Sequence, residues 1–153
     1  MKKIKLTRGK VALVDDADFE MLNKYKWYAR KRNSTFYATR AYQKNRTETG
    51  MHRIIMNTPK GMDTDHCDRD GLNNQRENLR VCTRSENLMN RSKFKNNTSG
   101  YKGVAWFEPS KKWQANIQLN SKQIHLGLFN TKELAYQAYV EACQKYHKKF
   151  AHY

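Results

Sequence analysis

The clearest hydrophobic pattern in the chain runs from Lys112 to Asn120, where apolar and polar residues alternate without a break. Alternation with a period of two is typical of a β-strand with one buried face. The apolar face carries Trp113, Ala115, Ile117 and Leu119, and the polar face carries Gln114, Asn116, Gln118 and Asn120. After a predicted turn at Ser121 and Lys122, Ile124 and Leu126 continue the apolar face while Gln123 and His125 continue the polar face.

A helical pattern follows these strands. Thr131 is a predicted N-cap, and Glu133 lies in the first turn, where the helix dipole favours an acidic residue. Small and apolar residues then recur at helical spacing, namely Leu134, Ala135, Ala138, Tyr139, Ala142, Cys143 and Tyr146. The pattern predicts a three-stranded antiparallel sheet, starting near Tyr101, packed on one helix, with the polar face of the sheet left open.

The first third of the chain predicts a β-rich segment. Strands are expected at residues 11–15, 26–31 and 35–43, the last two joined by a hairpin at residues 32–34. A short helix is expected over residues 16–25, with Asp16 as its N-cap, and a short amphipathic helix over residues 51–57, before Pro59.

The middle of the chain predicts a strand, a loop, a second strand and a helix. "DTDH" ends the first strand at His66, and "CDRDGLNNQR" is rich in loop-forming Gly, Asp and Asn. "NLRVC" predicts the second strand, and "TRSE" is a capping box, with Thr83 as N-cap, that opens a helix through Arg91. The polar stretch at residues 92–100 predicts a linker, after which the chain has lysines but no arginine.

The net charge of the chain indicates which class of partner it binds. Lys and Arg number 30 against 14 Asp and Glu, a formal net charge of +16, which favours a polyanion. No apolar run reaches the roughly 18 residues of a spanning helix, and the start lacks the apolar region of a signal peptide. We therefore expect double-stranded DNA as partner, and no membrane. Cys67, Cys82 and Cys143 form no C-x-x-C pair, so buried reduced thiols are expected and no zinc site.

Candidate chemistry gathers between Asp65 and Asn87. Asp65 and Asn87 can supply two oxygens to Mg²⁺, which keeps several waters and takes other ligands from phosphate. His66 is a candidate general base for an attacking water. These parts suit metal-assisted phosphodiester hydrolysis. Adjacent strand residues point to opposite faces, so Asp65 and His66 can share a site only where the strand ends or bulges.

The order "DH", loop, "NLR", "SEN" resembles the HNH nuclease motif of phage and intron homing endonucleases. The resemblance implies a ββα-metal fold, with His66 as catalytic base, Asp65 and Asn87 as metal ligands, and Asn78 as the residue that holds the loop and orients the histidine. A purely structural loop clamp explains Asn78 equally well. His52 is expected to pack or to contact phosphate, and Arg80, Arg84 and Arg91 are candidate phosphate contacts.

The last third resembles the apetala type of DNA-binding domain found in plant ethylene-response factors, through "SGYKGVAW", "KWQANI" and "IHLGLFNTKELAYQAYVEA". That resemblance implies that the sheet reads the major groove through Lys102, Ala105, Phe107, Gln118, Gln123 and His125. The amides of Gln114 and Asn116 lie on the same predicted face and suit adenine edges. A solvated polar face is the alternative interpretation.

Together these patterns predict an α+β protein. A nuclease region is expected over residues 1–91, with a β-rich segment at 1–50 and the ββα-metal motif at about 51–91, followed by the linker and a DNA-binding domain at 101–153. The predicted activity is that of a monomeric, intracellular site-directed DNA endonuclease of the homing type, in the cytoplasm of a bacterium or phage-infected host, using one Mg²⁺ or Mn²⁺ ion. The alternatives are a sequence-specific DNA-binding regulator with a vestigial nuclease motif and a nonspecific nuclease.

Overall fold

A computed structural model describes residues 1–32, 35–41, 48–94, 96–120 and 122–153. These residues form two compact units, Met1–Arg84 and Ser85–Tyr153, which are described separately below. Both contain helices and small antiparallel sheets, so the α+β class predicted from the sequence is confirmed. No helix in the described ranges is both long enough and apolar enough to cross a membrane.

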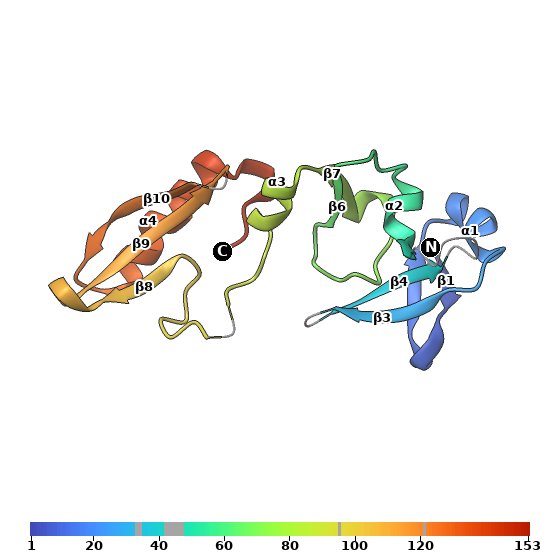
Figure 1. The fold of residues 1–153 in the computed structure, drawn as a ribbon, viewed down its shortest axis with the longest axis horizontal. Helices are drawn as coiled ribbons and strands as arrows, with labels where there is room; N and C mark the ends of the chain where they lie inside the picture. Colours follow the sequence, from blue (N-terminus) through green and yellow to red (C-terminus); the bar gives the residue numbers. More distant parts are fainter. Residues whose placement is uncertain (33–34, 42–47, 95, 121) are drawn as a thin grey trace. The chain divides into compact units, whose positions relative to one another are not determined.

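The N-terminal unit contains three small sheets and short helices (Figure 1). Its strands are β1 (Lys2–Lys5), β2 (Val11–Val14), β3 (Tyr28–Arg32), β4 (Thr35–Ala41), β5 (Glu48–Gly50), β6 (Asp63–His66) and β7 (Leu79–Cys82). Its helices are α1 (Asp16–Asn23) and α2 (Met51–Ile55), and α3 (Arg84–Met89) starts at its last residue. The strands pair as β1-β2, β3-β4-β5 and β6-β7. Of the predicted hairpin at residues 32–34, residues 33–34 lie outside the described residues.

One core joins the β-rich segment to the middle of the chain. Its buried members are Ile4, Ala12, Val14, Leu22, Trp27, Ala38, Met51, Ile55 and Leu79. The indole nitrogen of Trp27 donates to the carbonyl of Leu22 at 2.8 Å, so the polar atom of the largest core residue is satisfied. Because Leu79 in β7 belongs to this core, the strands β1, β2 and β4 support the hairpin that carries Asp65 and His66.

The C-terminal unit is a three-stranded sheet packed on one helix. Its strands β8 (Val104–Phe107), β9 (Lys112–Leu119) and β10 (Lys122–Phe129) pair in the order β10-β9-β8, and α4 (Lys132–Tyr146) lies against one face of the sheet (Figure 1). The buried face of the sheet includes Val104, Ala115 and Ile117, which pack with Ala135, Tyr139, Ala142 and Cys143 of α4. Alternation in β9 therefore predicted the buried face correctly.

The helix approaches the sheet closely at Gly103. A Cβ at this position would lie 2.1 Å from the Tyr139 ring and 2.8 Å from the carbonyl oxygen of Asn116, and the residue has φ +76°. Only glycine meets both conditions. Thr131 caps α4 as predicted, since its Oγ1 accepts from the backbone N–H of Leu134 at 3.3 Å.

Four local predictions were wrong. Asp15, rather than Asp16, occupies the N-cap position of α1, and it makes no side-chain cap because its carboxylate accepts from the backbone N–H of Arg76 at 2.8 Å. Helix α3 ends at Met89 rather than Arg91. Leu134 is 50% exposed, because the buried stripe of α4 starts one residue later, at Ala135. Cys67 is exposed, whereas Cys82 and Cys143 are buried free thiols as expected.

The end of the predicted linker is packed into the C-terminal unit. Ser99 is buried and its hydroxyl donates to the carbonyl of Val104 at 2.8 Å, while the Asn97 amide donates to the carbonyl of Tyr101 at 2.8 Å. These bonds hold the chain at the entrance to β8. Residues 97–100 are therefore part of the fold of this unit, not an open connection.

Candidate active site

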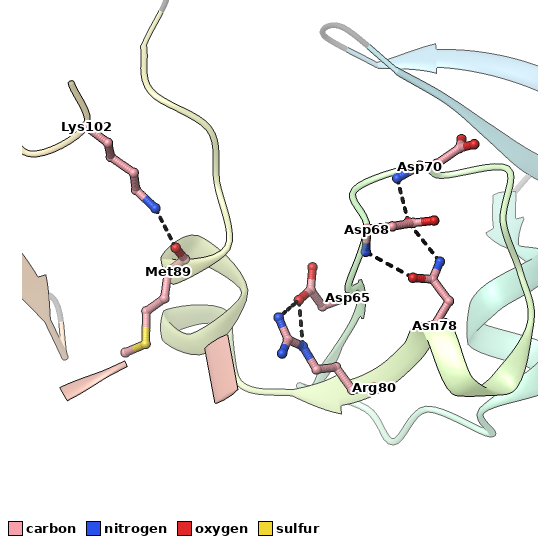
Figure 2. A network of polar contacts seen from close by, with 7 residues as sticks. All are labelled: Asp65, Asp68, Asp70, Asn78, Arg80, Met89 and Lys102. Carbon is pink, nitrogen blue, oxygen red and sulfur yellow. Dashed lines mark hydrogen bonds and ion pairs between the residues drawn. The ribbon is translucent and has the colours of Figure 1, made fainter. Parts of the chain in front are cut away.

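The β6-β7 hairpin places Asp65 beside Arg80. The two residues are register partners, and the Arg80 guanidinium donates to Asp65 Oδ2 from Nε at 2.8 Å and from Nη2 at 2.6 Å. Figure 2 shows the guanidinium turned toward the carboxylate. Asp65 is 7% exposed, and the guanidinium of Arg80 gives this buried carboxylate an ion-pair partner. Arg80, predicted to contact phosphate, is thus engaged with a predicted metal ligand.

His66 lies in an aromatic cluster. Its ring centroid is 5.0 Å from that of His52 and 5.8 Å from that of Tyr37, both in edge-on geometry. The residue is 5% exposed, and its Nε2 lies 3.4 Å from Oδ1 of Asn74. The register of β6 is unbroken through His66, so Asp65 and His66 leave the strand on opposite faces. The strand ends at His66, but the bulge that the sequence left open is not present.

Burial sets the protonation of the two histidines. It lowers the pKa of His52 to about 3, helped by the neighbouring His66, Arg53 and Arg32 and opposed by Asp63. Burial also lowers the pKa of His66 below its usual value, although the bond to Asn74 and the carboxylates of Asp68, Asp65 and Asp70 oppose the shift. Both imidazoles are therefore neutral near pH 7, the form required of a general base.

Asn78 clamps the loop between β6 and β7. Its Oδ1 accepts from the backbone N–H of Asp68 at 3.0 Å, and its Nδ2 donates to Asp68 Oδ1 at 2.9 Å and to the carbonyl of Asn73 at 2.8 Å. Figure 2 shows the Asn78 amide at Asp68, which in turn accepts from the backbone N–H of Asp70. These contacts match the loop-clamp interpretation of Asn78.

The N-terminal strands and helix hold the same loop from outside. Leu13 in β2 donates to the carbonyl of Leu72 at 2.9 Å and accepts from the backbone N–H of Asn74 at 2.8 Å. The guanidinium of Arg76 donates to both carboxylate oxygens of Asp18 in α1, at 2.8 and 2.6 Å. Gly71 packs on β4, where an added Cβ would lie 2.4 Å from the carbonyl oxygen of Phe36. Leu13, Asp18 and Phe36 thus support this loop, whereas the role expected of residues 1–46 from the sequence was only to support the hairpin and to add positive surface.

The remaining predicted residues of the central motif lie in or after α3. Asn87 is the fourth residue of α3 and belongs to the C-terminal unit, so its pairing with Asp65 as a metal ligand stays a prediction. Arg84 is exposed and its guanidinium forms an ion pair with Asp63 at 3.1 Å. The Arg91 guanidinium lies 5.2 Å from the ring centroid of Phe94.

The polar face of the C-terminal sheet carries most of the other predicted DNA contacts. Cross-strand register aligns Gln118 with Gln123, Asn116 with His125, and Gln114 with Ala105. His125 Nδ1 lies 3.1 Å from Asn116 Oδ1, and Phe107 is 36% exposed on this face. The structure therefore brings Ala105, Phe107, Gln114, Asn116, Gln118, Gln123 and His125 onto one face.

Two features of this face differ from expectation. The Lys102 ammonium donates to the carbonyl of Met89 at 2.7 Å (Figure 2). It also donates to the carbonyl of His152 at 2.9 Å, so its charge is bonded within the unit. A cavity of about 610 Å³ is lined by Gln114, Asn116, Gln118 and Gln123 together with Leu88 and Met89 of α3. The face is therefore flanked by α3 and is not open along its whole length.

The donors fit a hard divalent cation with few protein ligands. A carboxylate and an amide oxygen are ligand types of Mg²⁺, and Asp65 and Asn87 offer one of each. Among the described residues, no group of three or more His, Cys, Asp and Glu side chains is placed to hold a metal.

Three neighbours of His66 were not predicted from the sequence. Asn74 was treated as a loop residue, Tyr37 as a strand residue, and His52 was not placed beside His66. Only the polar, fully buried character of Asn74 marks it as unusual, and burial is not visible in a loop rich in Asn and Gly. Tyr37 and His52 reach the site from β4 and α2, a contact between distant segments that local patterns do not encode.

The segment that carries these residues is similar to a known protein family. Residues 57–89 match the model of the HNH endonuclease family. This HNH segment contains Asp65, His66, Asn78 and Asn87. The chain is also 38% identical over 65 residues to Protein 3.8 of Escherichia phage T7, over 42% of this chain and 54% of the relative. The chain thus spans about half the length of that phage protein, and no solved structure matches it.

Proposed function

We propose that the protein is a site-directed DNA endonuclease of the homing type. The observation that carries the proposal is the match of the HNH segment, residues 57–89, to a nuclease family over the part of the chain that holds Asp65, His66 and Asn78. The net charge of +16 supports double-stranded DNA as the substrate. The C-terminal sheet, with its row of amides, supports recognition of a defined site, in the manner of the apetala-type domains it resembles.

Each part of the proposed site has one task. Asp65 and Asn87 would hold one Mg²⁺ or Mn²⁺ ion, which when bound supplies charge stabilisation for the scissile phosphate and the leaving oxygen. His66 takes a proton from the attacking water. Asn78 holds the loop that follows His66. Arg80, Arg84 and Arg91 are assigned to phosphates near the cut, with Arg80 also pairing with Asp65.

A cleavage assay tests the proposal directly. Supercoiled plasmid and long linear DNA are incubated with the protein and Mg²⁺, with EDTA as control. We expect discrete fragments that disappear with EDTA. A smear of random lengths would replace the site-directed proposal with that of a nonspecific nuclease. Intact DNA with Mg²⁺ and with Mn²⁺ would overturn the nuclease proposal.

One observation favours a second function, a DNA-binding regulator with a vestigial nuclease motif. His66 is 5% exposed and lies among Tyr37, His52 and Asn74, a setting that also suits a structural core histidine. The retained Asp65, Asn78 and Asn87 favour the nuclease, since a regulator has no need of metal-ligand side chains there. Tight, sequence-specific binding without cleavage in the same assay would identify the regulator.

A further inference from the structure

The orientation of the Asn74 amide is determined by a backbone carbonyl. Asn74 is fully buried, and its Nδ2 donates to the carbonyl of Leu72 at 3.1 Å. A carbonyl oxygen accepts hydrogen bonds and cannot donate them, so the NH₂ group of Asn74 must face Leu72. Its Oδ1 therefore faces Nε2 of His66, at 3.4 Å.

The same reasoning extends to the imidazole. The amide oxygen of Asn74 can only accept, so the bond requires a hydrogen on Nε2 of His66. A neutral imidazole carries one ring hydrogen, and its lone pair is then on Nδ1. A main-chain carbonyl two residues from Asn74 thus selects the tautomer of His66 through one amide group.

The first strands of the chain hold in place this chain of hydrogen bonds from the Leu72 carbonyl through the Asn74 amide to His66. The backbone N–H of Leu13 donates to the Leu72 carbonyl oxygen, the atom that Asn74 also uses, and the Leu13 carbonyl accepts from the backbone N–H of Asn74. The edge-on rings of His52 and Tyr37 flank the imidazole on its other sides. Both the loop and the ring plane are therefore restrained by segments outside the HNH segment, since Leu13 and Tyr37 precede residue 57.

We propose that Asn74 is the positioning residue that holds His66 as the Nε2–H tautomer, so that Nδ1 is the nitrogen that accepts the proton of the attacking water. The catalytic half of this statement rests on the proposed nuclease function, whereas the tautomer does not. The role differs from the one that the family resemblance gives to Asn78, whose amide is bonded to Asp68 and Asn73.

Nitrogen NMR of the imidazole tests the tautomer without any activity. Protein with ¹⁵N-labelled histidine is recorded near pH 8, where a histidine with an ordinary or lowered pKa is neutral. The His66 signals are assigned by their loss in His66→Gln. We expect the two-bond coupling pattern of an Nε2–H imidazole. An Nδ1–H pattern in the wild-type protein overturns the proposal.

Two variants of Asn74 distinguish loss of the hydrogen bond to His66 from loss of the fold. Asn74→Leu removes the acceptor at similar volume, and we expect mixed tautomers and a kcat about 10- to 100-fold lower with little change in KM, the usual cost of losing an orienting partner. Asn73→Ala is the matched control in the same loop, because Asn73 bonds to Asp68 and Gln75 rather than to His66. It should keep the Nε2–H tautomer and kcat.

Asn74→Asp covers the case in which Asn74→Leu does not fold. A carboxylate keeps an acceptor toward His66, so the Nε2–H pattern should persist, and circular dichroism verifies the fold. A folded Asn74 variant without an acceptor that keeps a pure Nε2–H imidazole and full kcat contradicts the proposal, as does an Nδ1–H pattern in Asn74→Asp. If the wild-type protein shows the Nε2–H pattern but cuts no DNA, the nuclease proposal fails and the tautomer assignment stands.

Discussion

His66 combines two properties that usually exclude each other. A general base needs access to water, yet this imidazole is 5% exposed and surrounded by two rings and an amide. The same burial that limits access keeps the ring neutral and in one orientation, which favours proton transfer once water and phosphate are in place. Substituting His66 and His52 one at a time tests the role of each ring.

Substituting His66→Ala should reduce the single-turnover cleavage rate by about 10²- to 10⁴-fold, the usual contribution of a general base. DNA affinity should be unchanged, because the ring is buried and carries no charge near pH 7. Cleavage kinetics and a gel-shift assay measure the two quantities. His152→Ala, outside the HNH segment, is the control. Retention of most of the activity would rule out His66 as the base.

Acid should destabilise the protein through His52. The folded state binds this proton only near pH 3, whereas the unfolded chain binds it near pH 6.5. Between these values the unfolded state holds more protons, so stability is complete above about pH 6.5 and falls as the pH decreases. The charge would arise beside His66, Arg53, Arg32, Asp63 and the Tyr37 ring, where Nδ1 has no hydrogen-bond partner among the described residues.

Urea unfolding between pH 4.5 and 7.5 measures this slope. His52→Phe keeps an aromatic ring over Gly50 but cannot titrate, and it should reduce the slope by at most about 1.4 kcal/mol per pH unit, the linkage of one proton. The part of the slope that comes from His66 should remain. Identical slopes in the two proteins would show that His52 is not buried in solution.

At the scale of the elements, the loop between β6 and β7 depends on contacts from β2, α1 and β4. The ion pair of Arg76 with Asp18 is the strongest of these, since Asp18 is buried and both guanidinium bonds are short. Arg76→Ala leaves the carboxylate without this partner and should lower the free energy of unfolding by about 1–3 kcal/mol. Chemical denaturation checks the loss.

A double-mutant cycle with Asp18→Asn gives the control for this ion pair. The two substitutions should be less than additive, because either one removes the same contact. Arg69→Ala, in the same loop but exposed, should have little effect. Additive losses would show that the two side chains act independently.

The polar face of the C-terminal sheet should set affinity for the target site. Replacing Gln118, Gln123 and His125 with alanine removes side chains from the end of this face near the β9-β10 turn and should weaken specific binding by about 1–3 kcal/mol for each good base contact that is lost. Gln137→Ala with Gln144→Ala, exposed on α4, is the matched control. Equal loss in both sets would place the interface elsewhere.

Much of this element scale could be predicted from sequence. The alternation in β9 gave its buried face, and Thr131 gave the start of α4, because both signals are local. Asp15 and Lys102 could not be placed, because their bonds go to Arg76 and to the carbonyls of Met89 and His152, which lie in other segments of the chain. Asn74 could not be placed either, because its bond to His66 depends on how the loop between them folds. The HNH order located the candidate site, but it did not predict that Arg80 pairs with Asp65 or that His66 is enclosed.

For the whole molecule, the excess of positive charge should dominate affinity for DNA. The logarithm of the binding constant falls with the logarithm of salt concentration by about 0.9 per neutralised phosphate. With Arg80, Arg84 and Arg91 assigned to phosphates, we expect a slope of about −3 or steeper. Arg84→Ala should reduce the magnitude of this slope by about 1. Fluorescence anisotropy between 50 and 300 mM salt measures it. A slope near zero would contradict a phosphate-based interface.

Besides the Asn78 clamp, the described contacts that hold the loop from outside come from Leu13, Asp15, Asp18 and Phe36, which precede it in the chain. A polypeptide whose translation began at Met51 would still contain every residue of the HNH segment, and its sequence would still match the nuclease family. It would lack strand β2, whose Leu13 bonds to Leu72 and Asn74, and so it would lose the contacts that position His66. An intact HNH motif in a shortened copy of such a gene is therefore weak evidence that the encoded protein is active.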